Sequence, residues 1–194
     1  HGVLEIPAFL TNSGINARAV SEKELALNVV AQLKKVFKVE VKDLISNVDN
    51  SQIYLNDLGI SNLGLEKNKV INEIIKILKS FDFISNAYSS DYIMNSKGLD
   101  GYEKLIQNGF HEKRSGDIAL ILEPNVIFYD GKGTTHGSGY NYDTHVPLIF
   151  FGSGIKNGET ERITEIPDIA PTISKILGQK MKNSTGEYLD FIFD

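Results

Sequence analysis

Apolar residues recur at helical spacing in two long stretches of the chain. The first follows Ser21-Glu22-Lys23-Glu24, a sequence typical of a helix start, in which serine and glutamate side chains bond backbone amides reciprocally. Its apolar positions run from Leu25 to Phe37, and those of the second stretch run from Val70 to Phe81. The spacing predicts helices over about 22–37 and 70–81, whose apolar faces serve core packing rather than a cofactor site.

Short runs of β-branched and aromatic residues lie around these helices, bounded by turn-forming residues as is typical of strands. The predicted strands are 39–45, 52–55, 84–88, 118–122, 126–129 and 146–151, with a turn at 46–50. A short helix is expected at 100–106, and a last helix is expected to begin near Asp168 and to stop at Gly178. The alternation predicts an α/β fold that includes a β-α-β lobe.

A polar loop at 130–144 carries the candidate chemistry. It has no helix or strand period, contains four glycines and runs into the apolar stretch 146–151. His136 is the candidate metal ligand, because neutral imidazole is a common zinc ligand and the neighbouring glycines let backbone approach a metal closely. The alternative is a hydrogen-bonded loop histidine. Asp143 is a candidate to orient His136 or His145 as an acceptor behind the metal, and a purely structural role is the alternative for both Asp143 and His145.

Composition narrows the choice of partners. The chain has 194 residues, with 25 acidic against 20 basic side chains, a balance that offers no general attraction for nucleic acid or an anionic membrane. It has no cysteine, which removes disulfides, thiolate nucleophiles and cysteine-bound zinc. No apolar run approaches the roughly 20 residues that span a bilayer. We therefore expect no nucleic-acid partner and no membrane span.

Four segments, in this order, resemble the alkaline phosphatase superfamily in its type I phosphodiesterase/nucleotide pyrophosphatase-like and alkaline-phosphatase-like branch. They are His1-Gly2 with the apolar residues that follow, the Arg-Ser-Gly-Asp sequence at 114–117, the His-Gly-Ser to Val-Pro-Leu block at 136–148, and the last helix with Leu177-Gly178. The block at 136–148 is the most specific of these. The order and spacing together cover essentially the whole chain, and they match the C-terminal portion of such an enzyme.

The resemblance implies part of an alkaline-phosphatase-like mixed sheet flanked by helices, with a small inserted lobe. On this interpretation residues 1–45 begin the core, residues 46–112 form the inserted α+β lobe, and residues 113–194 form the C-terminal core segment with the metal-ligand loop. The resemblance also implies a periplasmic or secreted location. A sheet edge left uncovered would favour a homodimer.

The implied activity is hydrolysis of a phosphate ester at two zinc ions roughly 4 Å apart. In the family an Asp-His-Gly sequence and the His-Gly-Ser loop supply ligands to different zinc ions, so His1 and His136 would each provide one ligand. The nucleophile and the other ligands lie in the family's N-terminal part, so no catalytic nucleophile is assigned here. Because a catalytic zinc needs three or four protein ligands, we expect this chain alone to be inactive and to hold zinc weakly.

Several alternatives stay open at this stage. The chain would instead be a non-catalytic α/β binding or interaction domain of the same superfamily if His1 and His136 lay far apart, and a superfamily mutase or transferase is a further alternative. His1 itself has a second interpretation, as the remnant of an affinity tag. The sequence does not separate a phosphomonoesterase from a phosphodiesterase.

Overall fold

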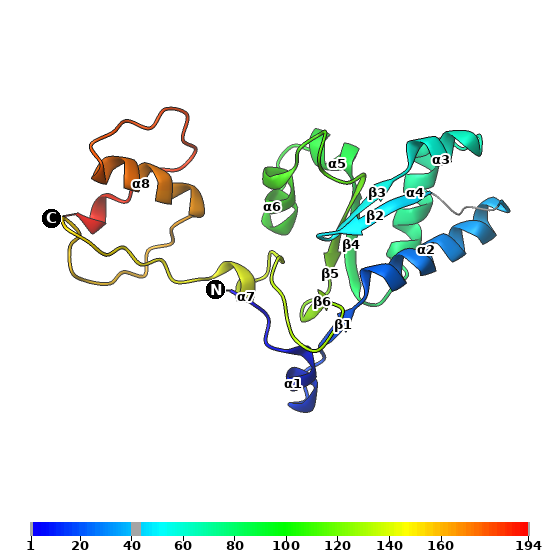
Figure 1. Cartoon of the computed structure of the whole chain (residues 1–194), viewed down its shortest axis with the longest axis horizontal. Helices are drawn as coiled ribbons and strands as arrows, with labels where there is room; N and C mark the ends of the chain where they lie inside the picture. The colour runs from blue at the N-terminus through cyan, green and yellow to red at the C-terminus, as the bar shows by residue number, and fades with distance from the viewer. Residues whose placement is uncertain (1, 40–43, 194) are drawn as a thin grey trace. The chain divides into compact units, whose positions relative to one another are not determined.

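The computed structural model describes residues 2–39 and 44–193, and the chain divides into two compact units after Val146 (Figure 1). In the first unit, four antiparallel strands form a sheet in the order β2 (Ile45–Asp49), β3 (Gln52–Leu55), β5 (Ile118–Leu122) and β4 (Ile84–Ser89). Two further strands, β1 (Arg18–Val20) and β6 (Val126–Phe128), pair in parallel. Parallel and antiparallel pairing with flanking helices confirms the predicted mixed α/β fold.

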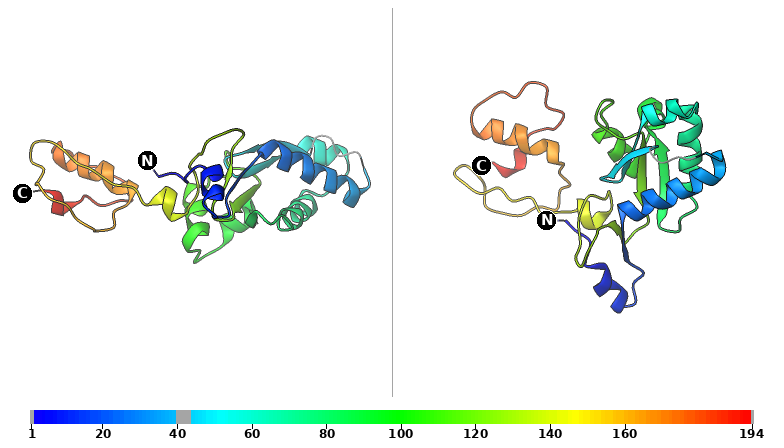
Figure 2. Two further views of the ribbon diagram at one scale, coloured as in Figure 1. Left: turned by 90° about the horizontal axis from the view of Figure 1, so that it is seen from below. Right: turned by 45° about the vertical axis from the view of Figure 1, so that its right-hand side comes forward.

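Helices cover both faces of the larger sheet. α2 (Glu22–Phe37) and α4 (Lys67–Leu78) lie on one face, while α5 (Ser90–Asn95) and α6 (Gly101–Gly109) lie on the other (Figures 1 and 2). Shorter helices of this unit are α1 (Pro7–Asn12), α3 (Asp57–Asn62) and α7 (Asn141–Thr144). The predicted helix at 22–37 is confirmed, and the predicted second helix is confirmed with slightly earlier bounds.

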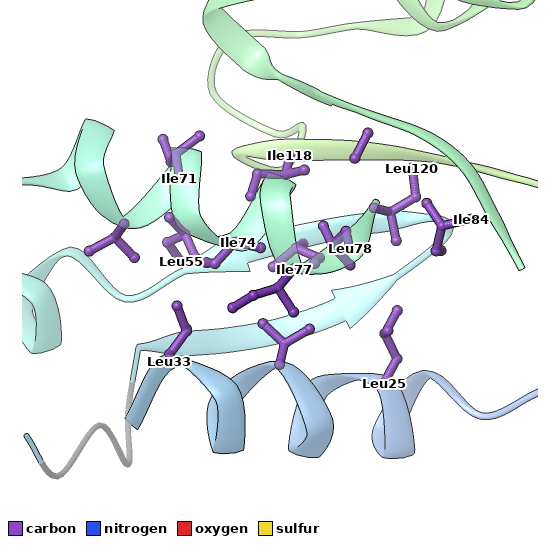
Figure 3. Packing of buried hydrophobic residues seen from close by; sticks show 14 of the residues in the cluster. Leu25, Leu33, Leu55, Ile71, Ile74, Ile77, Leu78, Ile84, Ile118 and Leu120 are labelled. Atoms are coloured by element: carbon purple, nitrogen blue, oxygen red, sulfur yellow. The ribbon is translucent and has the colours of Figure 1, made fainter. Parts of the chain in front are cut away.

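The core of the first unit lies between the two long helices and the sheet. Figure 3 shows Leu25 and Leu33 of α2 pointing toward Ile74 and Leu78 of α4, with Ile118 of β5 beside them. All five residues of β5 are buried, as expected for a strand with a neighbour on each side. Burial of this apolar surface explains why the helical spacing in the sequence was a reliable signal.

The strand predicted at 39–45 falls mainly on residues 40–43, which lie outside the described residues. α2 stops at Lys38, which has the left-handed φ of 56°, and the strand that follows is Ile45–Asp49. The predicted turn at 46–50 is therefore mostly strand. The chain reverses direction at Asn50 and Ser51, at the end of the predicted turn. Their φ values of 51° and 58° suit a two-residue hairpin turn.

The second unit is built around α8 (Ile169–Ile176), with the 3₁₀ helices η1 (Ile166–Asp168) and η2 (Asp190–Ile192). Thr172 is fully buried; its hydroxyl donates to the Asp168 carbonyl at 2.6 Å and accepts from the Leu189 amide at 2.9 Å. Asp168 is the residue at which α8 was predicted to begin, but it does not cap the helix with its side chain. Its carboxylate instead accepts from the amides of Glu165 and Glu187 at 2.9 and 3.0 Å, so it fastens both flanking segments.

The strand predicted at 146–151 is not formed in the described structure. These residues pair with no strand, and Ile149 and Phe151 are 82% and 101% exposed. Their composition fits a buried strand, but a strand needs a partner that accepts its backbone hydrogen bonds. No described segment of this chain fills that role, which leaves an apolar surface open.

The Ile149→Lys/Phe151→Lys double variant is expected to reduce self-association of the isolated chain. An exposed apolar segment with unpaired backbone is a template for pairing with another copy. Light scattering should show an apparent mass that rises with concentration for the unmodified chain and stays closer to the monomer for the variant. Leu58→Lys is the matched control, because Leu58 is 76% exposed but lies on the helix α3, whose backbone is hydrogen-bonded, rather than on an unpaired extended segment. A monomer at every concentration would contradict the expectation of a homodimer.

Candidate functional site

The polar loop predicted to carry chemistry is folded around Tyr140. The Tyr140 carbonyl accepts hydrogen bonds from the amides of Asp143 and Thr144, which opens the short helix α7. The Tyr140 hydroxyl donates to the Leu122 carbonyl at 2.7 Å, and this bond ties the loop to the end of β5. The loop is therefore anchored to the sheet although it has little regular structure of its own.

Asp143 holds the backbone on the C-terminal side of His136. Its Oδ2 accepts from the Gly137 amide at 3.1 Å and from the Ser138 amide at 2.6 Å. Its other oxygen, Oδ1, is buried and has no hydrogen-bond partner among the described residues. A buried carboxylate oxygen normally accepts a hydrogen bond. The Oδ1 atom of Asp143 therefore has an unused capacity to accept one beside His136.

The start of the chain lies against this same loop. The Thr134 hydroxyl donates to the carbonyl of the buried Leu4 at 2.6 Å. A Cβ added at Gly2 would lie only 2.2 Å from the Asp143 carbonyl oxygen, so only glycine allows this approach. His1 lies outside the described residues.

The structure thus brings together the two segments that were predicted to supply metal ligands. His136 is exposed in the anchored loop. His145 is also exposed and follows α7, with its backbone amide bonded to the Asn141 carbonyl at 2.9 Å. Among residues 2–39 and 44–193, no three His, Cys, Asp or Glu side chains are close enough to form a metal site by themselves.

Aromatic packing beside the loop was missed by the sequence analysis. The Tyr102 and Tyr140 rings meet edge to face at 5.4 Å, and Tyr142 lies 5.6 Å from Tyr140. Burial, reinforced by the neighbouring Tyr102, raises the pKa of Tyr140 to about 12, so its hydroxyl remains a donor near neutral pH. The tyrosines at 140 and 142 are visible in the loop sequence, but nothing in the sequence places Tyr102 beside them.

Asp143→Ala is expected to loosen the loop around His136. Two charge-assisted hydrogen bonds are lost, an effect of about 1.5–3 kcal/mol, which corresponds to roughly 10- to 100-fold faster amide exchange at Gly137 and Ser138. Hydrogen exchange of the full chain measures this directly. Asp130→Ala is the control, because Asp130 is exposed in the same loop. Unchanged exchange at 137–138 would show that the carboxylate does not order the loop.

The chain resembles known proteins in sequence and in structure. No protein-family model matches it. A protein from Myroides odoratus named calcium-transporting ATPase is 37% identical over 185 residues, which are 94% of this chain and 33% of that protein. Alkaline phosphatase PafA of Elizabethkingia meningoseptica is 34% identical over 148 residues, which are 76% of this chain and 27% of that enzyme. The chain thus spans about a third of the length of these relatives.

The structural match is more complete. The crystal structure of wild-type alkaline phosphatase PafA matches 100% of this chain and 37% of its own, with a TM-score of 0.88 and 29% sequence identity. No helix within the described residues is long and apolar enough to cross a membrane. Sequence and structure agree with the resemblance noted for the His-Gly-Ser loop, and the chain belongs to the alkaline phosphatase superfamily.

Proposed function

We propose that this chain is part of a zinc-dependent phosphate-ester hydrolase in which His1 and His136 each supply one ligand to one of two metal ions. The observation that supports this most strongly is the contact between Gly2 and Asp143, since Asp143 also holds the amides that follow His136. The two candidate ligand segments therefore converge on one aspartate.

The donor set fits zinc. Imidazole nitrogen is a preferred zinc ligand, and a ligating histidine usually donates its other N–H to a carboxylate or carbonyl. The free, buried Oδ1 of Asp143 offers such an acceptor beside both segments. His145 follows the same loop and can donate or accept a hydrogen bond. Because its side chain is exposed, it is able to contact a bound phosphate. When bound, a zinc pair would stabilise negative charge on the attacking and leaving oxygens.

On this proposal the chain is inactive by itself. Two histidines give each zinc one ligand, whereas catalytic sites use three or more. The nucleophile and the remaining ligands are assigned to the two thirds of the alkaline phosphatase fold that the chain does not match. The domain division at 46–112 and the periplasmic or secreted location are part of the same proposal and rest on the family resemblance.

The substrate class is a phosphate ester, with the choice between monoester and diester left to experiment. The Myroides odoratus relative is named as an ATPase, so a nucleoside triphosphate belongs among the substrates to be tested. Hydrolysis of such an anhydride needs the same stabilisation of phosphoryl charge.

The test is a chimera in which this chain replaces the matching third of PafA. The chimera is expected to hydrolyse p-nitrophenyl phosphate, and bis-p-nitrophenyl phosphate and ATP would rank its substrate classes. The isolated chain is expected to show no turnover and no tight zinc binding in a titration. Release of p-nitrophenol and inorganic phosphate are measured separately, because a transferase would release the first without the second.

Two results would contradict the proposal. A folded, zinc-loaded chimera without turnover would favour the non-catalytic binding domain. Tight zinc binding with turnover by the isolated chain would show that this chain carries a complete site of its own.

A further inference from the structure

A cavity lies beside the polar loop at 130–144, on the face of the sheet covered by α6. It is an open cavity of about 330 Å³, large enough for a small ligand group. β4 supplies Ser85, Asn86 and Tyr88 to its walls, the start of α6 supplies residues 100–103, and Ile121 and Tyr140 complete it. Neither His136 nor Asp143 lines it, so it is separate from the proposed metal ligands.

The walls combine aromatic rings with negative charge. Tyr88, Tyr102 and Tyr140 line the cavity together with the carboxylates of Asp100 and Glu103, and no lysine or arginine is among the described residues that line it. Lys79 lies outside this set, with its Nζ 5.9 Å from the centre of the Tyr88 ring. The cavity therefore has an acidic wall that no lining side chain neutralises.

Glu103 is held in place by hydrogen bonds from uncharged side chains. The Tyr88 hydroxyl donates to the Glu103 carboxylate, and the Asn86 side-chain amide donates to the Tyr88 hydroxyl at 2.5 Å. Both donors are neutral groups. Neither donor brings a positive charge to the carboxylate, and the chain Asn86–Tyr88–Glu103 fixes its direction.

We propose that this cavity binds a small organic cation, an alkylammonium or quaternary ammonium group. Tyrosine rings attract such cations, and nearby carboxylates add an ionic attraction that a neutral ligand lacks. The Tyr88 ring is already engaged, stacked on Tyr92 at 5.0 Å with Lys79 over it, so the rings of Tyr102 and Tyr140 are the ones assigned to the cation. An anionic group such as a free phosphate would meet two carboxylates and no lining cation. The charge of the walls thus favours the cation over the anion.

The position of the cavity suggests what the cation is attached to. Tyr140 lies four residues after His136, so their Cα atoms are at most about 14 Å apart along the chain. A phosphate ester of an amino alcohol would place its ammonium group here and its phosphate toward the loop. This last step rests on the proposed phosphatase function, whereas binding of the free cation does not.

The experiment titrates the full chain with choline and with 3,3-dimethyl-1-butanol, which has nearly the same shape and no charge. Binding is followed by NMR chemical shifts and by tyrosine fluorescence, which is free of interference because the chain has no tryptophan. We expect millimolar choline binding with shifts at Tyr88, Tyr102 and Tyr140, and roughly tenfold weaker binding of the neutral alcohol.

Two variants sharpen the result. Glu103→Gln keeps hydrogen-bonding capacity but removes the charge, so choline binding is expected to fall about fivefold to tenfold. Asp91→Asn is the control, because Asp91 is an exposed acid on α5 that does not line the cavity. Equal affinity for choline and the neutral alcohol, shifts confined to other regions, or no binding of choline would each overturn the proposal.

The test does not depend on phosphatase activity. It uses the isolated chain without metal or phosphate, so failure of choline binding would leave the metal-site proposal standing. Failure of the chimera to hydrolyse phosphate esters would equally leave the cation site standing. Only the proposal that the substrate is an amino-alcohol phosphate requires both the cation site and the metal site.

Discussion

His136→Ala is expected to lower kcat/KM of the chimera for p-nitrophenyl phosphate by about 1000-fold or more. The change removes one of the three or four ligands of a catalytic zinc ion, and a zinc ion contributes several kcal/mol of transition-state stabilisation. The chimera should also lose about half of its zinc, because the proposal assigns His136 to one of two metal ions. Metal content by mass spectrometry and steady-state kinetics give the two readouts.

His145→Ala is the matched control for this prediction. It lies in the same segment and is exposed like His136, but it has no proposed role as a ligand. We expect its zinc content to be unchanged, which separates loss of a metal ligand from loss of a phosphate contact. If His145→Ala lost zinc and His136→Ala did not, the assignment of the ligand within the loop would be wrong.

Asp117→Ala is expected to lower the free energy of unfolding by about 2–4 kcal/mol. Asp117 directly precedes β5 and ties it to two other elements: its Oδ2 accepts from the Leu55 amide of β3 at 2.7 Å, and its Oδ1 pairs with Lys67 of α4 at 2.7 Å. Because the Asp117 side chain is 21% exposed, the expected loss of unfolding free energy is slightly smaller than for a fully buried ion pair.

Removal of Asp117 also weakens the interactions of the two groups that it contacts. The Leu55 amide would lose its acceptor. Burial lowers the pKa of Lys67, but hydrogen bonds to Asp117 and Asp57 outweigh this and raise the pKa above its usual value. Loss of Asp117 removes one of these two stabilising contacts, so the cost falls on both β3 and α4.

Asp82→Ala is the control for the stability measurement. Asp82 pairs with Arg18 at 2.5 Å, but its side chain is 83% exposed, and such a surface pair contributes about 0–1 kcal/mol. Urea unfolding followed by circular dichroism compares the two variants under identical conditions. Equal losses for Asp117→Ala and Asp82→Ala would contradict the role assigned to Asp117.

Elements whose signals are local were predictable from the sequence. The helix at 22–37 was correct because Ser21 caps it, accepting from the Glu24 amide, and because its apolar face packs in the core. The strand at 52–55 was correct to the residue. The hairpin before it was misplaced because Asn50 and Ser51, rather than the whole polar stretch 46–50, take the left-handed turn conformation.

Features that depend on distant partners were not predictable. The stretch 146–151 has the composition of a buried strand, but pairing depends on a neighbouring strand that the sequence of the stretch cannot reveal. The position of β5 between β3 and β4 in the sheet likewise depends on strands that are distant in the sequence. The division at 46–112 itself stays a prediction.

The candidate site shows the same contrast. His136 and Asp143 were identified from the loop, and the structure adds that Asp143 binds the amides after His136. The approach of Gly2 to Asp143 links residues at opposite ends of the first unit's sequence, and the family resemblance suggested it where spacing alone could not. The tyrosine-lined cavity was missed because it is assembled from four separate segments.

The most direct test of the central claim is anomalous scattering at the zinc edge from crystals of the chimera. The account predicts two peaks, one about 2.0–2.1 Å from an imidazole nitrogen of His136 and the other at the same distance from an imidazole nitrogen of His1. Zinc bound elsewhere in an active chimera, with both histidines free of metal, would contradict it.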